Sequence, residues 1–550
     1  MGSIVKEVQT FQSFFEPIPK SFIQNNKHKI SYEKLYSSVN NLRRAFKSYG
    51  ITKQERMIII SDPCIEWILC DITCIKSGII TIPLFQNSSE NTLNFQLNDC
   101  NATHLIVENE ITLEKISKII ETTDIQFKNI FLFHKSKKFP EIKTIWQIIE
   151  ERQNSDSDEI LPNEVMSQEE TATIIYTSGT SGNPRGVILS HKNLAYQLSD
   201  IHIAFINAKT GDNAISILPL AHIYQRTIIH FFLSNGINVF FVNDIPNVLK
   251  YIKQIQPELI TIVPRILEKI YGTIKNQIQA KSKIVQKILL PMLEYASRKE
   301  INNSLLKLIF NTIFFNKVRN IFGKNMLCIV CGGAKLNAHE ELFFHNAGVP
   351  FFQGYGMTEC SPVIASNTVM ANKMFTVGRP FSSVEVKISQ IGEICVRGGS
   401  VFNGYLNKPQ RDPDEFFPTG DLGTIDSDGF LTVVGRIKEQ CKNSNGKFVN
   451  IIKIESMLNE ISGIENSCVI AEGRPYTTAI LFTQRIDIDS IQLAIDEMNK
   501  SLEHQEHIQY FYVSLIKPTV ENNIITPSMK LRRNYVMERY AKEIEKLYNK

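Results

Sequence analysis

A loop rich in glycine and hydroxyl residues, YTSGTSGNPRGV (176–187), has residue types that could bind phosphate. It follows the β-branched run TATIIYT, and its glycines would let the backbone turn tightly and direct N–H groups inward. Short hydroxyl donors and the cation of Arg185 lie in the same stretch, which suits a polyanionic phosphate chain. The loop lacks the Gly-Lys-Ser/Thr spacing of a Walker A motif. An ordinary surface turn is the alternative interpretation.

The same loop resembles the phosphate-binding signature of adenylate-forming enzymes, which reads close to YTSGTTGxPKGV. This superfamily includes acyl-CoA synthetases, luciferase-type enzymes and peptide-synthetase adenylation domains. Arg185 stands where the family usually has lysine; the charge is kept, but a planar guanidinium replaces a point-like ammonium. The resemblance implies nucleotide contacts from Thr177, Ser178, Gly179, Thr180, Ser181, Gly182, Arg185 and Gly186, with Thr180 also a ligand of Mg²⁺.

A second segment, QGYGMTEC (353–360), resembles the nucleotide motif that follows a strand in the same family. The resemblance implies that Tyr355 stacks on adenine, that Thr358 contacts the α-phosphate and that Glu359 holds Mg²⁺, which prefers hard carboxylate oxygens beside substrate phosphates. Two glycines of this motif would let the backbone approach a flat base. CGGAKL (331–336) resembles the segment that shapes the adenine and acyl pockets. These segments add the candidate nucleotide-binding residues Gln353, Gly354, Gly356, Met357, Gly333 and Ala334.

Three motifs nearer the C-terminus complete the resemblance. FPTGDLG (417–423) resembles the ribose motif, and the carboxylate of Asp421 could accept both ribose hydroxyls. GRIKE (435–439) resembles the hinge, with Arg436 near the ribose and Lys438 as the pivot. TPSMKLRR (526–533) resembles the C-terminal catalytic motif and implies that Lys530 reaches the adenylation site. Any one of these positions could be an ordinary solvated residue, but their order along the chain matches the family.

Narrower similarities indicate a subfamily. Four segments resemble long-chain fatty acyl-CoA synthetases: LPLAHIYQR (218–226), VPRILEKIY (263–271), TECSPVIASN (358–367) and VGRP (377–380). The resemblance places His222 beside the acyl carboxylate as a candidate catalytic residue; a satisfied core histidine is the alternative. Ile451 replaces a proline usual in the family, at a loop that is exposed after domain rotation.

The reaction that the resemblance implies has two halves. A fatty carboxylate attacks the α-phosphate of ATP to give acyl-adenylate and pyrophosphate, with Mg²⁺ as cofactor, and the thiol of CoA then displaces AMP. Catalysis is assigned to Lys530, Thr358, Glu359 and His222. An acyl–acyl-carrier-protein synthetase is the alternative enzyme. A catalytically inactive fatty-acid or nucleotide sensor is a further alternative, although Lys530 and Glu359 are both present.

The elements that must position these motifs alternate between helix and strand. ISYEKLYSSVNNLRRAFKSYG is helical in period and ends at Gly50, and the phosphate loop is expected to lead into a helix with Ser190 as N-cap. This alternation predicts an α/β fold with parallel or mixed sheets covered on both faces. Short strands with Gly/Asp turns at 383–435 predict a small β-subdomain. We expect an N-terminal adenylation domain of two α/β subdomains at 1–435, and a small mobile α+β domain at 436–550.

Composition excludes several classes of protein. The 550 residues are 43% hydrophobic and 21% charged, which excludes a disordered, collagen-like or coiled-coil chain. A net charge of +4 is too small for nucleic-acid binding over the whole surface. The ten cysteines are scattered, and the only Cys-x-x-Cys lies in MLCIVCGG without a second pair. Reduced structural thiols, typical of a cytosolic protein, are therefore expected.

Membrane contact is left open by the sequence. The N-terminal 20 residues have no apolar core for a secretory signal, Lys6 stands where a myristoylation site needs Ser or Thr, and no apolar run is long enough to span a bilayer. Segment 275–324, however, carries ten Lys/Arg against two Glu, interleaved with apolar runs. Such helices could lie on an anionic membrane surface. Alternatively, their apolar faces pack on the body and their basic faces are solvated. The expected location is cytoplasmic, with possible peripheral membrane contact.

Overall fold

The structure is a computed structural model. The two strands on either side of the phosphate loop belong to a seven-stranded sheet in the N-terminal part of the chain. The residues described are 11–15, 21–25, 28–153, 164–177, 184–205, 207–244, 247–437, 440–461, 463–484, 487–526 and 531–549. The expectations about a secretory signal and myristoylation fall on residues outside these ranges. In the order β18-β8-β7-β4-β3-β5-β6, the strands from β7 to β6 are parallel and β8 and β18 are antiparallel. Their bounds are β3 (Arg56–Ile60), β4 (Ile80–Leu84), β5 (His104–Val107), β6 (Asn129–Leu132), β7 (Thr171–Thr177), β8 (Arg185–Ser190) and β18 (Gly404–Tyr405).

Helices cover both faces of this sheet, as the alternating pattern predicts. The helix that ends before Gly50 is confirmed, since α1 is N-capped by Ser31 and Gly50 has a φ of 70°. The strand β4 is buried along its whole length, as expected for a parallel strand covered on both faces. The helices are α1 (Tyr32–Ser48), α2 (Ile65–Ser77), α3 (Glu90–Cys100), α4 (Glu110–Ile120) and α5 (Ile145–Gln153); a short 3-10 turn, η1 (Phe11–Phe14), precedes them.

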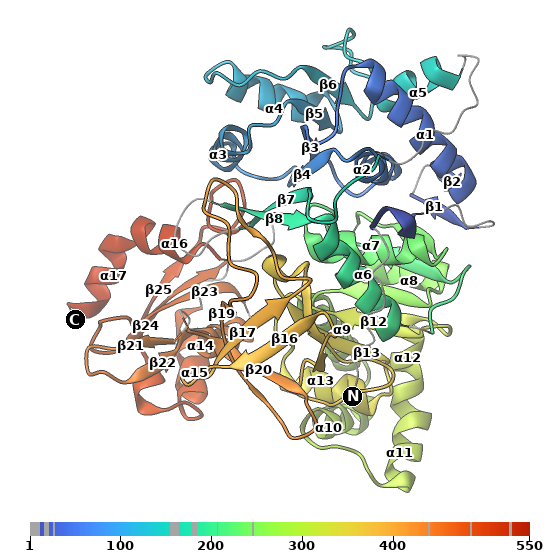
Figure 1. Cartoon of the computed structure of the whole chain (residues 1–550). Coiled ribbons are helices and arrows are strands. Elements are labelled where there is room, and N and C mark those ends of the chain that lie inside the picture. The colour runs from blue at the N-terminus through green and yellow to red at the C-terminus, as the bar shows by residue number, and fades with distance from the viewer. Residues whose placement is uncertain are drawn as a thin grey trace.

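A nine-stranded mixed sheet lies below the first in Figure 1, with the order β15-β14-β13-β12-β11-β9-β10-β1-β2. Its strands are β1 (Phe22–Gln24), β2 (Lys29–Ser31), β9 (Asn213–Ser216), β10 (Asn238–Phe241), β11 (Leu259–Ile262), β12 (Cys328–Cys331), β13 (Phe351–Gly356), β14 (Val363–Ser366) and β15 (Arg379–Pro380). Its helices are α6 (His191–Ala204), α7 (Ile223–Ser234), α8 (Val248–Ile255), α9 (Pro264–Gln279), α10 (Lys283–Arg298), α11 (Ser304–Phe310), η3 (Asn311–Phe315, a π-helix), α12 (Asn316–Phe322) and α13 (Ala338–Asn346). A 3-10 turn, η4 (Thr358–Cys360), follows β13.

The main hydrophobic core joins the two large sheets. Figure 1 shows α6 and α7 between them, and every residue of α7 from Ile223 to Leu233 is buried. The largest buried side chain is Trp67 of α2, in the same core. A helix buried all round must satisfy any polar residue that it carries, a requirement that becomes important at Arg226.

The expected β-subdomain is a four-stranded antiparallel sheet in the order β16-β17-β19-β20. Its strands are β16 (Val384–Ile388), β17 (Glu393–Gly398), β19 (Phe417–Ile425) and β20 (Leu431–Arg436). One strand of the same region, β18, instead pairs with β8 of the seven-stranded sheet. The small sheet therefore reaches back to the phosphate hairpin.

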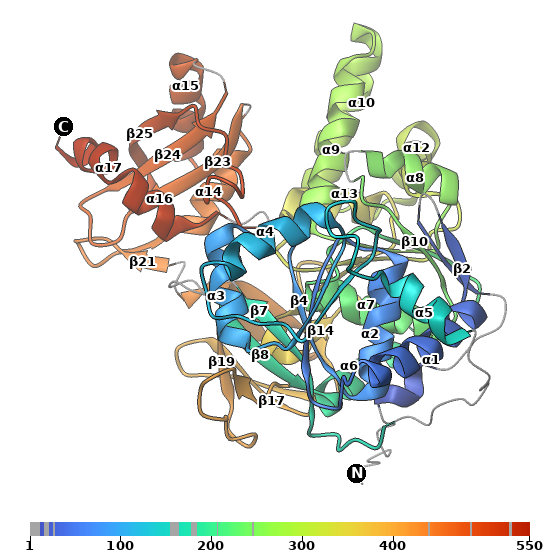
Figure 2. The same ribbon diagram turned by 90° about the horizontal axis from the view of Figure 1, so that it is seen from above.

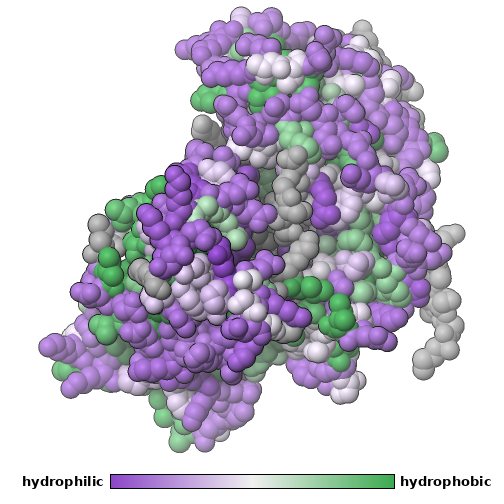
Figure 3. Space-filling view, turned by 90° about the vertical axis from the view of Figure 1, so that its left-hand side faces the viewer, coloured by the Kyte–Doolittle hydropathy of each residue, from purple (hydrophilic) through white to green (hydrophobic). Residues whose placement is uncertain are grey.

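The C-terminal domain forms its own lobe, at the lower left of Figure 1 and the upper left of Figure 2. Its hydrophobic clusters share no residue with the N-terminal core and lie around the sheet β23-β24-β25. Seen from that side, in Figure 3, the surface is mainly hydrophilic and its outline is indented above the lobe. The elements are β21 (Gln440–Lys442), β22 (Phe448–Asn450), α14 (Ile451–Asn459), β23 (Ile464–Ile470), β24 (Thr477–Thr483), α15 (Ile488–Asn499), η6 (His504–Glu506), β25 (Ile508–Ser514), α16 (Arg533–Arg539) and α17 (Ala541–Tyr548).

Two expectations about the whole chain can be compared with the structure. All ten cysteines are free, and most are buried, so the prediction of structural thiols is confirmed. Among the described residues, no helix is both long and apolar enough to cross a bilayer.

Candidate active site

Asp421 is the centre of one hydrogen-bonded cluster at the end of β13. Its Oδ2 accepts the hydroxyl proton of Tyr355 at 2.6 Å, and its Oδ1 accepts from Arg436 Nε at 2.9 Å. The strand register explains the ion pair, because Asp421 of β19 lies directly opposite Arg436 of β20. Burial and the adjacent Asp421 carboxylate raise the pKa of Tyr355 well above its usual value, so Tyr355 stays a neutral donor. The predicted adenine and ribose residues are thus in contact.

Glu359, four residues after Tyr355 in the sequence, is the centre of a second cluster. The side chain is 5% exposed, and its Oε1 accepts the hydroxyl proton of Tyr405 at 2.7 Å. The guanidinium carbon of Arg185 lies 4.5 Å from the centre of the Tyr405 ring. Burial, followed by the Glu359 carboxylate, raises the pKa of Tyr405. Arg185, Tyr405 and Glu359 therefore form a row from the phosphate hairpin to the predicted metal ligand, beside the buried Thr358.

The phosphate loop connects two antiparallel strands. Thr177 ends β7 and pairs with Arg185, which begins β8, while residues 178–183 lie outside the described part of the chain. The loop precedes the expected helix, but a strand that was not predicted lies between them, because the β-branched stretch RGVILS forms β8. Ser190 is confirmed as the N-cap of α6, in a capping box with Asn193.

Glycines of the predicted motifs are required by contacts within the protein. A Cβ on Gly356 would lie 1.9 Å from the Pro362 carbonyl oxygen, and one on Gly186 would lie 3.0 Å from Ile174 Cγ2. Gly333 has a φ of 86°, which favours glycine. At Gly354 a Cβ would make only ordinary contacts, at 3.5 Å or more. Gly356 is therefore required by the close approach of the Pro362 backbone, while its approach to a base stays a prediction.

His222 is the N-cap of α7, and its Nδ1 accepts the backbone N–H of Tyr224 at 3.2 Å. The residue is exposed, so the interpretation as a core histidine is wrong. The hydroxyl of Tyr224 donates to Val330 O at 3.2 Å and lies 3.3 Å from where Gly332 would carry a Cβ. The start of α7 is thus adjacent to the glycine segment after β12, where Gly333 and Ala334 are exposed.

Lys438 and Lys530 lie outside the described residues, and so do the loop residues Ser178, Gly179, Thr180, Ser181 and Gly182. The chain beside Lys530 is described. Ile525 and Leu531 form an antiparallel bridge, and Arg532 Nη2 donates to Thr92 Oγ1 on α3 at 3.3 Å. The described chain just after Lys530 therefore contacts the N-terminal domain through Arg532.

The remaining predicted residues are distributed along the same elements. Gln353 and Gly354 lie on β13 with Tyr355, and Met357 connects β13 to η4. Sequence reasoning missed Tyr405, because its partner Glu359 is 46 residues away and β18 is only two residues long. It also missed the buried pair of Asp71 and Arg226, whose signal was a charge in the middle of the apolar helix α2 and the one Asp, Glu, Lys or Arg of the apolar helix α7.

Comparison with known proteins gives relatives along nearly the whole chain. A long-chain-fatty-acid–CoA ligase, FadD15 of Mycobacterium bovis, is 28% identical, covering 92% of this chain and 89% of its own. The chloroplastic long-chain-fatty-acid–[acyl-carrier-protein] ligase AEE15 of Arabidopsis thaliana is 25% identical, over 95% of this chain and 83% of its own. Fatty acyl-CoA synthetase B of Dictyostelium discoideum is 30% identical over 69% of this chain and 63% of its own.

Solved structures share the fold at low sequence identity. ATP-bound MatB of Rhodopseudomonas palustris superposes with a TM-score of 0.73 at 19% identity, over 96% of this chain and 98% of its own. MenE of Bacillus subtilis, in complex with ATP and magnesium, has a TM-score of 0.69 at 20% identity, over 94% and 96%. The family model for AMP-binding enzymes matches residues 16–406, and the model for their C-terminal domain matches 438–550. The chain belongs to the AMP-binding enzyme family.

Proposed function

We propose that this protein is an AMP-forming long-chain fatty acid–CoA ligase that uses ATP, a fatty acid and CoA. One observation carries the proposal: the residues that the family resemblance assigns to ribose and Mg²⁺, Asp421 and Glu359, are buried carboxylates held by Tyr355 and Tyr405 at one edge of the fold. The long-chain acid as substrate rests on the ligases of Mycobacterium and the other long-chain relatives.

The Asp421 cluster would bind adenosine. Both carboxylate oxygens accept hydrogen bonds from protein donors, and Arg436, whose side chain is 45% exposed, is the donor most open to exchange. A ribose diol would replace one or both donors, because its two hydroxyls can supply the same hydrogen bonds to the carboxylate. Tyr355 would then be released to lie against the adenine.

The Glu359 cluster fits Mg²⁺. Among the described residues only Tyr405 donates to this carboxylate, through Oε1, which leaves Oε2 for a hard cation. Those residues also contain no group of three or more His, Cys, Asp or Glu side chains that could hold a metal. This agrees with a Mg²⁺ site made of one carboxylate, substrate phosphates and the proposed ligand Thr180. Bound there, Mg²⁺ would neutralise charge on the phosphates, while Thr358, Arg185 and the 177–186 loop position them for in-line attack.

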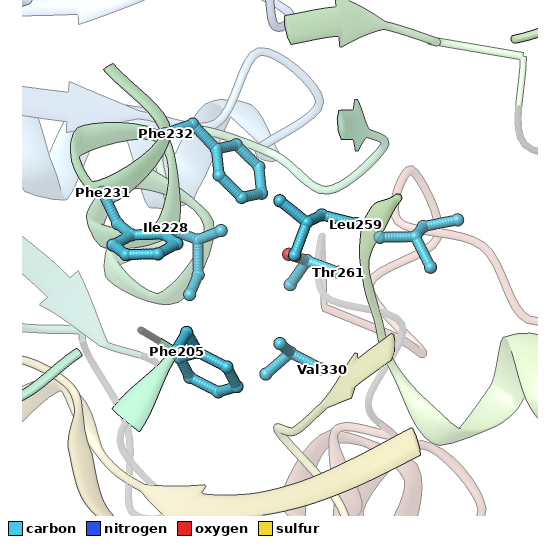
Figure 4. Close-up of a pocket in the computed structure, with 8 residues that line it drawn as sticks. Phe205, Ile228, Phe231, Phe232, Leu259, Thr261 and Val330 are labelled. Carbon is cyan, nitrogen blue, oxygen red and sulfur yellow. The ribbon is translucent and has the colours of Figure 1, made fainter. Parts of the chain in front are cut away.

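An acyl chain would enter between α7 and the strands β11 and β12. Figure 4 shows a small cavity there, about 10 Å³, lined by Phe205, Ile228, Phe231, Phe232, Leu259, Ile260, Thr261 and Val330. The cavity follows α7 away from His222, so a carboxylate beside His222 would direct its tail into it. The cavity must widen by side-chain movement to hold a chain. We expect Val330→Trp to shorten the longest acid accepted without changing the KM for ATP.

The C-terminal domain would supply the second half of the mechanism. We place the domain boundary between 435 and 436, with Lys438 as pivot, and assign Lys530 to adenylation. The contact of Arg532 with Thr92 supports this, since Arg532 follows Lys530 by two residues in the sequence and links the C-terminal domain to the N-terminal domain. Rotation about Lys438 would then withdraw Lys530, and the thiolate of CoA would attack the acyl carbonyl and release AMP.

The acceptor could instead be an acyl carrier protein, as the name of the Arabidopsis relative indicates for that enzyme. Most of the long-chain relatives are named as CoA ligases or acyl-CoA synthetases, which favours CoA. For the location of the protein we propose a cytoplasmic enzyme in peripheral contact with a lipid surface, where long-chain acids accumulate.

The test is pyrophosphate release from Mg-ATP with acids from acetate to arachidate, each with CoA, with holo-acyl-carrier protein or with neither. We expect release that requires a long-chain acid, is stimulated by CoA and falls at least about a hundredfold in Lys530→Ala. Lys542→Ala, an exposed lysine of the same domain, is the matched control. Stimulation by the carrier protein alone would transfer the proposal to that acceptor, and no release with any acid would favour a sensor.

A further inference from the structure

Two helices that project from the body expose apolar side chains among lysines. Figure 2 shows α10 extending beyond the rest of the molecule. Its exposed apolar residues are Ile284, Ile288 and Tyr295, and those of α11 are Leu305, Leu308 and Ile309. We refer to these six residues as the α10–α11 surface.

The six residues form a stripe along each helix. Ile284 and Ile288 are one turn apart and 75% and 51% exposed, and Tyr295 lies two turns further on the same face. On α11, Leu305, Leu308 and Ile309 have the spacing i, i+3, i+4, and the first two are 66% and 62% exposed. The expectation that the apolar faces pack on the body therefore holds only in part. Each helix has a second apolar face directed outwards.

The two stripes adjoin each other. The ring of Tyr295 lies 6.0 Å from that of Phe310, the buried residue that anchors α11. Phe310 in turn packs on Phe315, at 5.2 Å between ring centres. The α10–α11 surface is thus supported by packed aromatic side chains.

Basic residues surround this surface. Segment 275–324 has a net charge of +8, from ten Lys/Arg and two Glu; because the whole chain carries only +4, the rest of the chain is net negative, at −4. Lys283 and Lys287 flank the Ile284–Ile288 stripe and are exposed, and Lys307 is exposed between the leucines of α11. One of the two acids, Glu294, is neutralised by Arg298 at 3.1 Å.

We propose that the α10–α11 surface docks the enzyme on an anionic lipid bilayer, with the six apolar side chains in the headgroup region and the lysines on lipid phosphates. Exposed apolar residues among lysines suit the surface of an anionic bilayer. There, burial of apolar side chains and attraction of lysines to lipid phosphates both favour binding. In a dimer formed through this face, two segments with a net charge of +8 each would face one another. Their repulsion disfavours self-association. The inference deepens the proposed function, since the enzyme would then take its acid from the bilayer.

The test is flotation of the full-length protein with vesicles of phosphatidylcholine alone or mixed with phosphatidylglycerol, at low and high salt. We expect binding to the mixed vesicles that weakens at high salt, because screening shortens the electrostatic range. Lys283→Glu with Lys287→Glu, and separately Leu305→Ser with Leu308→Ser, should each lower the partition coefficient at least about tenfold. The matched controls are Leu493→Ser, at a leucine 71% exposed on α15, and Lys542→Glu.

Three results would overturn the proposal: equal binding to neutral and anionic vesicles, binding unchanged in the paired variants, or no binding. Loss of a dimer in the leucine variant, seen by sedimentation, would assign the surface to a second copy instead. Flotation requires no turnover, and activity on detergent-dispersed acid is measured separately. Failure of the docking surface can therefore be distinguished from failure of the ligase.

Discussion

Two clusters of this protein each combine a carboxylate, an arginine and hydroxyl groups, but they differ in burial. In the buried ion cluster, Arg226 and Asp71 have side chains 0% and 1% exposed. In the nucleotide-side cluster, Arg436 is 45% exposed while Asp421 is 5% exposed. The same chemistry is therefore closed in one place and open on the arginine side in the other.

In the buried ion cluster, most hydrogen-bonding groups are paired within the protein. Arg226 donates to both oxygens of Asp71, at 3.1 and 2.5 Å, and to the hydroxyls of Thr173 and Thr81, each at 2.7 Å. His230 Nε2 lies 2.8 Å from the same carboxylate. Asp71, Thr81, Thr173 and Arg226 come from α2, β4, β7 and α7, so the cluster joins the phosphate-loop strand to the helix that His222 caps. If the Asp421 cluster binds the nucleotide as proposed, exposure of the cation is what distinguishes it from the structural cluster.

The pKa values of the buried ion cluster are shifted by its burial and by its charges. Burial alone would raise the pKa of Asp71, but Arg226 and His230 outweigh it and the pKa lies below its usual value. Burial lowers the pKa of His230 despite the adjacent carboxylate, so the ring is neutral. Among the residues that the structure describes, its Nδ1 has no hydrogen-bond partner, which fits a tautomer with the proton on Nε2.

The largest expected effect is the loss of Arg226. Arg226→Met should lower the free energy of unfolding by about 3–5 kcal/mol, because it leaves the Asp71 carboxylate buried without its main partner. Arg436→Met is the matched control and should cost less than about 1 kcal/mol, since its ion pair is half exposed. Urea denaturation of both variants measures the difference. Equal losses would contradict the distinction between the two clusters.

The next largest effect concerns turnover, not stability. Glu359→Gln keeps the shape of the side chain and an acceptor for Tyr405 but removes the charge that would hold Mg²⁺. We expect kcat for pyrophosphate release to fall about 10²–10³-fold with an unchanged urea midpoint. The control is Glu385→Gln on β16, whose carboxylate pairs with Arg397 at 2.8 Å on the surface. A full rate in Glu359→Gln would remove this residue from the metal site.

How much of this contrast could be predicted from sequence depends on whether a signal is local. The strand TATIIYT, the N-cap Ser190 and the β-subdomain are confirmed, because short stretches determine them. Membership of the family could be predicted because the family's motifs have nearly fixed sequences. The hairpin strand β8 was missed, since the helix signal at Ser190 hid the β-branched residues before it.

Contacts between distant segments could not be predicted. Asp71 and Arg226 are 155 residues apart, and one sequence does not show which charge in an apolar helix meets which. Tyr405 reaches Glu359 only because β18 joins the sheet through β8. The roles of Lys438 and Lys530 stay predictions.

A smaller effect tests the open cluster. Asp421→Asn keeps the size of the side chain but weakens an acceptor that would bind the ribose diol, so we expect about tenfold weaker ATP binding, from the roughly 1.5 kcal/mol of a charge-assisted hydrogen bond. Titration calorimetry measures the Kd. Asp426→Asn, at a surface carboxylate 2.8 Å from Lys373, is the control. Unaltered affinity would mean that Asp421 serves only Arg436.

The smallest effect comes from a place where three carboxylates meet. Glu340 of α13 lies near Glu268 of α9 and Glu460 at the end of α14, and burial and these two charges raise its pKa from 4.5 to about 8. A raised pKa means that the protonated form stabilises the fold. That contribution is complete below pH 4.5 and is lost as the pH rises through 8.

Glu460 also accepts a hydrogen bond from Asn337 at 2.6 Å, which is a contact between the two domains. Ionisation of Glu340 therefore weakens the fold next to this contact. Glu340→Gln should therefore flatten the decline of the melting temperature between about pH 5 and 8, whereas Glu538→Gln, at an exposed residue of α16, should leave it unchanged. A variant with an unchanged decline would show that these carboxylates do not repel one another. The two arginine clusters should keep their stability across this range, because each carboxylate there already has a permanent cation beside it.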